Sequence, residues 1–425
     1  MKILYVSQFF PPEVAAGGIR VAELAARWSS GASVQVLTGF PNYPSGRLFP
    51  GYREKRWRGI AREDWNGVGV VRAPITIRPN GGALDRTLNY LSFCASAAMT
   101  GSFLSRPDVI IATSPPLTVA LCGYLLAQRF RVPWVFEVRD LWPESLAAAG
   151  ATEQSRSYRA LVRLAGYLYR KADTVVAVSP AIRAELVDRL GVDPSKAAVV
   201  ENGVEDHLLE ATAASRAGLR DELQLRGKFT VCYVGAIGLA HGLSTILEAA
   251  AAARTSMPNL VFLLVGDGSE AQDLARRARD QGLTNVTFLG TQPRERIPSI
   301  LRACDAAAVL LKKSDIFKTV IPTKMLEAMA AGLPVILGVE GQAQAILEAS
   351  GAGVPIAPGD ATALLEAIGY LQNNPSVAAQ MAGRGPDFVA RNFSRSRLAS
   401  RYLDLLRVLA GEEQPAGRKF AHAVK

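Results

Sequence analysis

The sequence predicts an α/β protein with two Rossmann-like domains, each built on a parallel sheet. At 425 residues the chain is too long for one ordinary hydrophobic core. Short apolar runs alternate with helical patterns in both halves, which is typical of βαβ units. The alternation stops near residue 200 in a polar stretch rich in Ala and Arg, and it begins again at Phe229. We therefore expect one domain over residues 1–205 and a second over 206–393.

Each domain has its own set of apolar runs. In the first domain they predict strands at Lys2–Val6, Val34–Leu37, Val68–Arg72, Val109–Ala112, Trp134–Val138 and Thr174–Val178. In the second they predict strands at Phe229–Val234, Leu260–Val265, Val286–Leu289, Ala306–Leu311 and Val335–Leu337. A helical pattern follows at about 394–410, whereas residues 411–425 carry Gly, Pro and charge without a period. This last stretch is expected to be a mobile tail.

The composition excludes several classes of protein. The formal net charge is +10, but the cations are spread along the chain and form no known nucleic-acid-binding module, so nucleic acid is not an expected partner. The four cysteines lie far apart in apolar surroundings, without the spacing of metal ligands: Cys94, Cys122, Cys232 and Cys304. They are expected to be reduced core residues. The first apolar run is too short for a signal peptide, so a cytoplasmic protein is expected.

Two segments raise the question of a membrane. No residue from Thr87 to Ser105 is charged, but Asn89, Ser92 and Ser96 make this stretch polar for a membrane span and favour a packed amphipathic helix. Between Gly51 and Arg62 the chain carries Arg53, Lys55, Arg56, Arg58 and Arg62, interleaved with Tyr52 and Trp57. This basic segment fits either peripheral attachment to anionic lipid headgroups or a solvated loop, and the sequence leaves both open.

Glycines follow three of the predicted strands. Gly17 and Gly18 precede the first helix, where backbone N–H groups could face an anion or a sugar, although glycines there also simply mark turns. After strand 229–234 come Gly235, Gly238 and His241, a candidate diphosphate loop. After strand 260–265, Gly266 and Gly268 form a tight turn at the carboxyl end of the sheet, where open α/β folds bind ligands.

The richest segment runs from Lys318 to Pro334. Pro322 and Thr323 predict a helix start, and Gly332-Leu333-Pro334 predicts its end, so Lys324 and Glu327 lie one turn apart on one helix face. A cation in the first turn of a helix interacts unfavourably with the helix dipole. Binding of an anionic ligand would account for a lysine at this position. A carboxylate one turn later can accept two hydrogen bonds from a vicinal diol such as that of ribose. The alternative is an ordinary exposed Lys/Glu pair.

Several short motifs occur one after another along nearly the whole chain. They are Lys2-Ile3-Leu4 with Gly17-Gly18, Glu201-Asn202-Gly203-Val204, Tyr233-Val234-Gly235, Val265-Gly266-Asp267-Gly268, Phe288-Leu289-Gly290 and Leu326-Glu327-Ala328-Met329-Ala330-Ala331-Gly332-Leu333-Pro334. In combination they resemble the retaining glycosyltransferases of family 4. Within that family, the segments Glu137–Ser145 and Ile321–Met325 resemble the branch that builds O-antigen, colanic acid and capsule, including N-acetyl-L-fucosamine transferases.

The resemblance implies a GT-B fold, with two Rossmann-like domains facing a cleft and a C-terminal helix that returns to the N-terminal domain. It implies a nucleotide-sugar donor, with a UDP-sugar expected, held mainly by the C-terminal domain. It also implies a lipid-diphosphate-linked saccharide as the acceptor, at the cytoplasmic face of the membrane. By matching positions, Glu327 is the second glutamate of the family's E-x7-E signature and would bind ribose, Gly235 opens the phosphate loop, and Gly266 and Gly268 form a turn near the base.

The chain departs from the family pattern at four positions. Thr319 replaces the first signature glutamate, Ala236 and His241 replace a phosphate-binding arginine and lysine, and Arg139 stands where a histidine commonly precedes Asp140. These changes shift the expected cationic role to Lys324, with Arg139 as a second candidate. Asp140 or Glu144 would orient the acceptor hydroxyl or support positive charge on the sugar. The segment around Thr319, Pro322 and Thr323 is counted with the donor site, and Gly17 and Gly18 with the acceptor side.

No Asp-x-Asp pair occurs in the chain, so neither a bound metal nor another cofactor is expected. Two other functions remain open. A UDP-N-acetylglucosamine 2-epimerase on the same fold would convert the donor alone, without an acceptor. A non-catalytic partner subunit, suggested by the replaced positions Ala236 and Thr319, would bind the donor without turnover.

Overall fold

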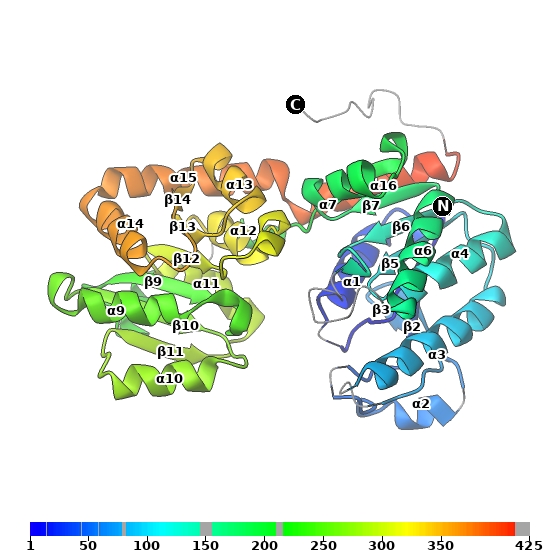
Figure 1. Ribbon diagram of the computed structural model, residues 1–425, viewed down its shortest axis with the longest axis horizontal. Helices are drawn as coiled ribbons and strands as arrows, with labels where there is room; N and C mark the ends of the chain where they lie inside the picture. Colours follow the sequence, from blue (N-terminus) through cyan, green and yellow to red (C-terminus); the bar gives the residue numbers. More distant parts are fainter. Residues whose placement is uncertain are drawn as a thin grey trace. The chain divides into compact units, whose positions relative to one another are not determined.

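The structure, a computed structural model, describes residues 1–13, 15–43, 45–57, 59–78, 82–144, 155–209 and 216–412. The chain divides into two compact units (Figure 1). Unit 1 comprises Met1–Glu201 and the chain from Ser396 onward, and unit 2 comprises Asn202–Arg395. The sequence put the boundaries at 205/206 and 393/394. Of the expected tail, residues 413–425 lie outside the described residues.

Unit 1 is built on an eight-stranded sheet in the order β3-β4-β2-β1-β5-β6-β7-β8, in which β3 alone is antiparallel to its neighbour. Its strands are β1 (Lys2–Val6), β2 (Ser33–Gly39), β3 (Ala61–Trp65), β4 (Val68–Ala73), β5 (Val109–Ser114), β6 (Trp134–Val138), β7 (Thr174–Ala177) and β8 (Ala197–Val199). The six strands predicted in this half are confirmed. The edge strands β3 and β8 were not predicted, because β3 reads Ala-Arg-Glu-Asp-Trp and β8 is only three residues long.

Alternating residues of the unit 1 strands feed two separate cores, as the two-residue period of a strand requires. Leu4 and Val6 belong to one core, and Ile3 and Tyr5 to the other. The helices of this unit are α1 (Ala16–Trp28), α2 (Arg53–Trp57), α3 (Ala83–Ser102), α4 (Leu117–Phe130), α6 (Arg156–Lys171) and α7 (Pro180–Ala184). Short helical turns lie at Glu185–Arg189 (η1), Pro194–Lys196 (η2) and, at the start of unit 2, Asp206–Leu208 (η3).

The last described helix, α16 (Arg395–Leu409), packs in unit 1, as the GT-B resemblance implied. The indole nitrogen of Trp28 in α1 donates to the carbonyl oxygen of Ala399 at 2.8 Å, and the rings of Trp28 and Tyr402 meet edge to face at 5.2 Å. These contacts join the second core of unit 1 to a segment 371 residues further along the chain.

Unit 2 has a six-stranded sheet, parallel throughout, in the order β11-β10-β9-β12-β13-β14. Its strands are β9 (Phe229–Val234), β10 (Leu260–Val265), β11 (Val286–Gly290), β12 (Ala306–Leu310), β13 (Val335–Gly338) and β14 (Gly353–Pro355). Its helices are α8 (Arg216–Glu222), α9 (Ser244–Ser256), α10 (Ala271–Asp280), α11 (Ile297–Ala303), α12 (Thr323–Ala330), α13 (Gln342–Ser350), α14 (Ala361–Asn373) and α15 (Pro375–Asn392). Single turns occupy Leu239–His241 (η4), Arg294–Arg296 (η5) and Asp315–Thr319 (η6). All five predicted strands are present.

The strand orders fix where ligands can bind. The chain direction across each sheet reverses between β1 and β5 in unit 1 and between β9 and β12 in unit 2. At such a point the loops after the two strands leave toward opposite faces and open a crevice at the carboxyl ends. The loop after β9 begins at Gly235, and the chain after β12 leads to α12, so two of the predicted donor segments converge at this position.

The structure decides three of the sequence-based expectations, which concern helix α3, the cysteines and the start of helix α1. The uncharged segment forms α3, which lies on the protein as a packed helix, and no helix in the described ranges is long and apolar enough to cross a bilayer. All four cysteines are buried and free. The expectation that Gly17 and Gly18 precede the first helix is wrong, because α1 already begins at Ala16 and both glycines lie in its first turn.

Candidate active site

Helix α12 positions the two side chains on which the sequence analysis depends. Pro322 is its N-cap residue, so the helix begins where the sequence predicted. Met325, Leu326 and Met329 are buried in the core of unit 2, which orients the helix. Lys324 and Glu327, one turn apart, both line a single pocket.

This pocket, of about 560 Å³, opens at the carboxyl ends of the unit 2 strands. Its wall is formed by the residues that follow β9, β10 and β11, by α12, and by the chain around Glu205. The lining includes Val234, Gly235 and Ala236 at the end of β9, Val265, Gly266 and Asp267 at the end of β10, and Thr291, Gln292 and Arg294 after β11. A pocket of this size, at the point where the strand order reverses, is where an open α/β sheet binds a small ligand.

Lys324 is a cation with a neutral partner. Its Nζ donates to the hydroxyl of Tyr233 at 2.5 Å and lies 4.3 Å from the centre of the same ring. The Tyr233 hydroxyl in turn donates to the carbonyl oxygen of Ala236 at 2.6 Å. Burial lowers the pKa of Lys324 from 10.5 to about 8, against the opposing charge of Glu327. Its surroundings therefore differ from those of an exposed helical Lys/Glu pair, and an anion bound in the pocket would favour the protonated ammonium.

Glu327 is partly buried, and burial raises its pKa, while Arg294, Arg395 and Lys324 oppose that rise. Arg294 lies on the pocket wall, 3.5 Å from Glu205, and Glu205 also pairs with Arg395. Arg294 and Glu205 belong to none of the motifs on which the site was predicted. Arg294 follows strand β11 by four residues, so the rule that ligands bind at strand ends could have found it.

The glycines at the ends of β9 and β10 allow these loops to pack closely. A Cβ atom at Gly266 would lie 2.0 Å from the carbonyl oxygen of Gly235, and one at Gly268 would lie 2.3 Å from the carbonyl oxygen of Ile237. Gly235 and Gly266 have φ angles of +139° and +134°. The N–H groups of both residues donate to strand-end carbonyls of Val265 and Gly290. These two glycines therefore shape the pocket floor through their lack of a side chain, while their own N–H groups bond within the sheet.

Six other predicted donor residues lie outside the lining of this pocket: Gly238, His241, Gly268, Thr319, Pro322 and Thr323. The Nδ1 of His241 accepts from the N–H of Gly238 at 3.3 Å. Burial, with the charge of Lys324, lowers the pKa of His241 to about 4, so this ring is neutral near pH 7. His241 therefore does not supply the cation that the family has at this position, whereas Lys324 lines the pocket beside the loop.

In unit 1 the structure brings two predicted residues together, Arg139 and Gly17. The guanidinium of Arg139 donates to the hydroxyl of Thr113 at 2.8 Å and to the carbonyl oxygen of Pro115 at 3.0 Å. A Cβ atom at Gly17 would lie 2.0 Å from its Nη1, so only glycine leaves room for this side chain. Burial lowers the pKa of Arg139. This contact gives Gly17 a packing role beside the C-terminal ends of β5 and β6.

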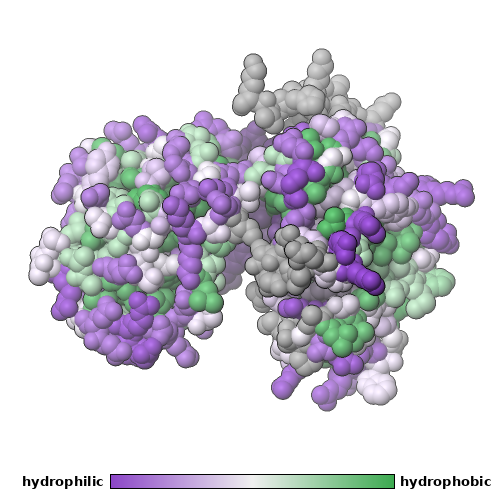
Figure 2. Space-filling model, viewed as in Figure 1, coloured by the Kyte–Doolittle hydropathy of each residue, from purple (hydrophilic) through white to green (hydrophobic). Residues whose placement is uncertain are grey.

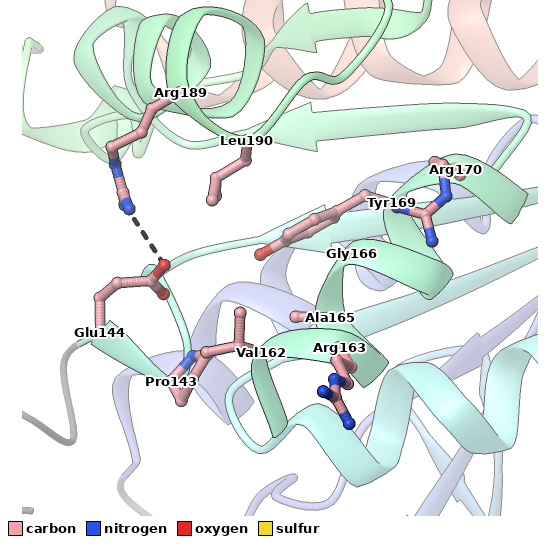
Figure 3. A pocket seen from close by; sticks show the side chains of 10 residues that line it. All are labelled: Pro143, Glu144, Val162, Arg163, Ala165, Gly166, Tyr169, Arg170, Arg189 and Leu190. Carbon is pink, nitrogen blue, oxygen red and sulfur yellow. Dashed lines mark hydrogen bonds and ion pairs between the residues drawn. The ribbon is translucent and has the colours of Figure 1, made fainter. Parts of the chain in front are cut away.

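The two predicted carboxylates differ in their surroundings. Asp140 is exposed. Glu144 lines a second pocket of unit 1, of about 330 Å³, against helix α6, where Arg189 donates to it at 3.3 Å (Figure 3). Tyr169 and Leu190 line the same pocket, which includes neither Arg139 nor Gly17. The catalytic roles of Arg139, Asp140 and Glu144 stay predictions.

Both halves of the chain match families of known proteins. Residues 216–388 match the family "Glycosyl transferases group 1", and residues 16–203 match the "Glycosyl transferase 4-like domain". The chain is thus a group 1 glycosyltransferase of the GT-B type, with a family 4-like N-terminal domain.

Its relatives include proteins named for polysaccharide synthesis. It is 27% identical over 353 residues to the putative colanic acid biosynthesis glycosyl transferase WcaI of Escherichia coli K12, a match that covers 80% of this chain and 84% of WcaI. It is 26% identical over 282 residues to the probable glycosyltransferase WbjE of Pseudomonas aeruginosa, covering 66% and 69% of the two chains. Among solved structures, Anabaena Alr3699/HepE in complex with UDP has a TM-score of 0.70 at 20% identity, over 96% of this chain and 100% of that one. At 20% identity, the similarity to HepE shows the fold alone.

Proposed function

We propose that this enzyme transfers a sugar, with retention, from a nucleotide diphosphate donor to a lipid-diphosphate-linked saccharide in the synthesis of a cell-surface polysaccharide. One observation carries the proposal: Lys324 and Glu327 line one pocket at the reversal point of the unit 2 sheet, a turn apart on α12. A single helix end thus offers a cation for the diphosphate and a carboxylate for the ribose diol. A UDP-sugar is the proposed donor, since HepE was solved with UDP and with UDP-glucose.

The transfer reaction requires the protein to stabilise the charge of the leaving diphosphate and to position the acceptor. The bond between the sugar C1 and the diphosphate oxygen breaks, the acceptor oxygen bonds to C1 from the same face, and the acceptor proton passes to the departing diphosphate. Negative charge on the diphosphate grows as the bond breaks, so an ammonium placed beside it stabilises the transition state more than the ground state. Lys324 is assigned this role, and Arg139 is a second candidate.

The lipid-linked acceptor is proposed from the names of the relatives. WcaI is named for colanic acid biosynthesis, and a further relative, TuaH of Bacillus subtilis, for teichuronic acid biosynthesis. TuaH is 27% identical over 204 residues, which cover 48% of this chain. Both names describe assembly of a surface polymer, and in the proposed reaction the growing saccharide is carried on a lipid diphosphate.

The test is a binding screen of UDP-, GDP- and dTDP-sugars by calorimetry, followed by mass analysis of products formed on a lipid-diphosphate-linked saccharide. We expect one UDP-sugar to bind, Lys324→Ala to weaken its binding, and the product mass to rise by one sugar. Conversion of the donor in the absence of acceptor would instead identify an epimerase. Donor binding with no product on any acceptor would identify a non-catalytic subunit, and the absence of all nucleotide-sugar binding would refute the donor site.

A further inference from the structure

The outer face of α3 is apolar along its whole length. Six outward residues recur every three or four positions, and large side chains at five of them are exposed. They are Leu84 (72% exposed), Leu88 (39%), Leu91 (52%), Ala95, Met99 (65%) and Phe103 (83%), the last directly after the helix. Figure 2 shows hydrophobic side chains gathered along the front of unit 1 where α3 lies. A helix of 20 residues is about 30 Å long. The exposed apolar surface along it is therefore much larger than that of a single exposed leucine, which would need no explanation.

Several polar residues in the middle of α3 bond to neighbouring loops, although Arg86 and Thr87 near its start are exposed. Asn89 accepts from the amide of Gln8 at 2.6 Å and donates to the carbonyl oxygen of Thr76 at 2.9 Å. The hydroxyl of Ser92 accepts from the N–H of Thr76 at 2.9 Å, and the hydroxyl of Ser96 donates to the carbonyl oxygen of Pro74. Much of the polarity that argued against a membrane span in the sequence is therefore taken up by hydrogen bonds to the loops beside α3.

Cations lie around this stripe. Exposed arginines, Arg86 and Arg106, lie at its two ends. Helix α2, at the same end of unit 1 in Figure 1, exposes Arg53, Lys55 and Arg56 beside Trp57, whose side chain is 87% exposed. Tyr52, next to α2, packs on the same core as Phe93 of α3. An apolar stripe with basic residues at its ends, together with a basic helix that exposes a tryptophan in the same unit, has the composition of a surface that enters the headgroup region of a membrane.

We propose that the outer face of α3, together with the basic helix α2, docks this protein on an anionic lipid surface. Charge complementarity selects this occupant over a second copy of the chain. A second copy would bring the cations of α2 and the ends of α3 against their own kind, whereas anionic headgroups neutralise them. The stripe lies in the plane of the membrane surface, with Leu and Met side chains at the level of the acyl chains and Arg side chains at the phosphates.

Vesicle co-sedimentation tests the apolar half of the surface. Wild-type protein, Leu91→Glu/Met99→Glu, and the control Tyr370→Glu/Val408→Glu are mixed with vesicles of phosphatidylglycerol and phosphatidylcholine in equal parts. Tyr370 and Val408 are exposed on α14 and α16, so the control adds the same charge elsewhere. We expect the α3 variant to bind at least about a hundredfold more weakly, since it removes two large apolar side chains and adds two anions. The control should bind as the wild type does.

The basic half is tested with Arg53→Glu/Arg56→Glu against the control Lys228→Glu/Arg391→Glu, whose residues are exposed in unit 2. The α2 variant should lose affinity for the mixed vesicles and show a weaker dependence on salt, while the control does neither. Wild-type binding to pure phosphatidylcholine should be weaker than to the mixed vesicles.

Several results would overturn the proposal. They are absence of wild-type binding to the mixed vesicles, equal binding by the α3 variant, or equal binding by the α2 variant. A wild-type dimer in sedimentation equilibrium that Leu91→Glu/Met99→Glu converts to monomer would show that the face joins two copies instead. None of these measurements uses the transfer reaction, so their failure leaves the donor site of unit 2 untouched.

Discussion

Two cations, the buried Arg20 of unit 1 and the half-buried Lys324 of unit 2, differ in the partners that hold their charge. Arg20 in α1 donates to Glu137 at 3.2 Å and to the carbonyl oxygens of Val200 and Glu201 at 2.8 and 2.9 Å. Burial alone would lower the pKa of Arg20, but the charges of Glu137 and two tyrosines outweigh it and raise that pKa. Lys324 in α12 donates to a neutral phenol, and its pKa falls. We therefore expect Arg20, which has charged and carbonyl partners, to support the fold, and Lys324, which has a neutral partner, to bind an anionic ligand.

The largest effect is expected at the fully paired cation. Arg20→Met leaves the carboxylate of Glu137, which is fully buried, without its counter-charge, so the free energy of unfolding should fall by about 3–5 kcal/mol. Denaturant unfolding of the variant measures this loss. As a matched control, Arg20→Met/Glu137→Gln should recover part of the stability, because no uncompensated charge then remains. A loss near zero in the single variant would remove the contrast between the two cations.

Substitution of Lys324 should lower the activity rather than the stability of the protein. Lys324→Ala removes the charge that opposes the growing negative charge of the leaving diphosphate, so kcat should fall about a hundredfold or more. The fold should be kept or strengthened, because the pKa of Lys324 in the folded protein shows that its charge is unfavourable there. Steady-state kinetics and a thermal melt decide. Kinetics close to wild type would move the active site elsewhere, and a large fall in Tm would make Lys324 a structural residue.

Substitution of Glu327 should change the kinetics in a different way from substitution of Lys324. Glu327→Ala removes a contact to the ribose that is present before and during the reaction, so the donor KM should rise about tenfold with a smaller change in kcat. Glu327→Gln, which keeps one acceptor oxygen, should lie between the variant and the wild type. An equal loss of kcat and kcat/KM at both Lys324 and Glu327 would mean that the two residues act together in the transition state.

The low pKa of Lys324 predicts a pH dependence of donor binding. The free protein holds this proton only below about pH 8, whereas a bound diphosphate favours the protonated form. Donor Kd should therefore increase as pH rises from 7 to 9, because binding then requires uptake of a proton. In Lys324→Met this dependence should be absent. Calorimetry in two buffers of different ionisation enthalpy measures the proton uptake directly, and a Kd independent of pH in both proteins would contradict the assignment.

The smallest expected effect is that of a chelator. If cationic side chains carry the leaving charge, EDTA should leave the rate intact. A rate abolished by EDTA and restored by Mg²⁺ or Mn²⁺ would contradict the proposed mechanism, and Lys324 would then be an accessory to a metal.

Much of the fold could be predicted from local pattern. Strands β1, β6, β9 and β10 have the predicted bounds, because their apolar runs are long, buried and bounded by polar residues. The edge strand β3 could not be predicted, since only one of its five residues is buried. The start of α1 was placed three residues too late, because glycine is read as a turn signal in sequence, while here it admits the guanidinium of Arg139.

By itself the sequence determined that Lys324 and Glu327 share a helix face, because the period of a helix is local. It also determined that glycines follow β9 and β10. Only the tertiary structure decided that Tyr233 is the partner of Lys324, that Arg294 joins the same pocket, and that Asn89 of α3 is buried against Gln8. These features depend on which strands are neighbours and on which face of a helix meets the sheet. The strand order places β9 beside β12 across some 70 residues of chain, and such non-local pairing is set by the packing of the whole unit.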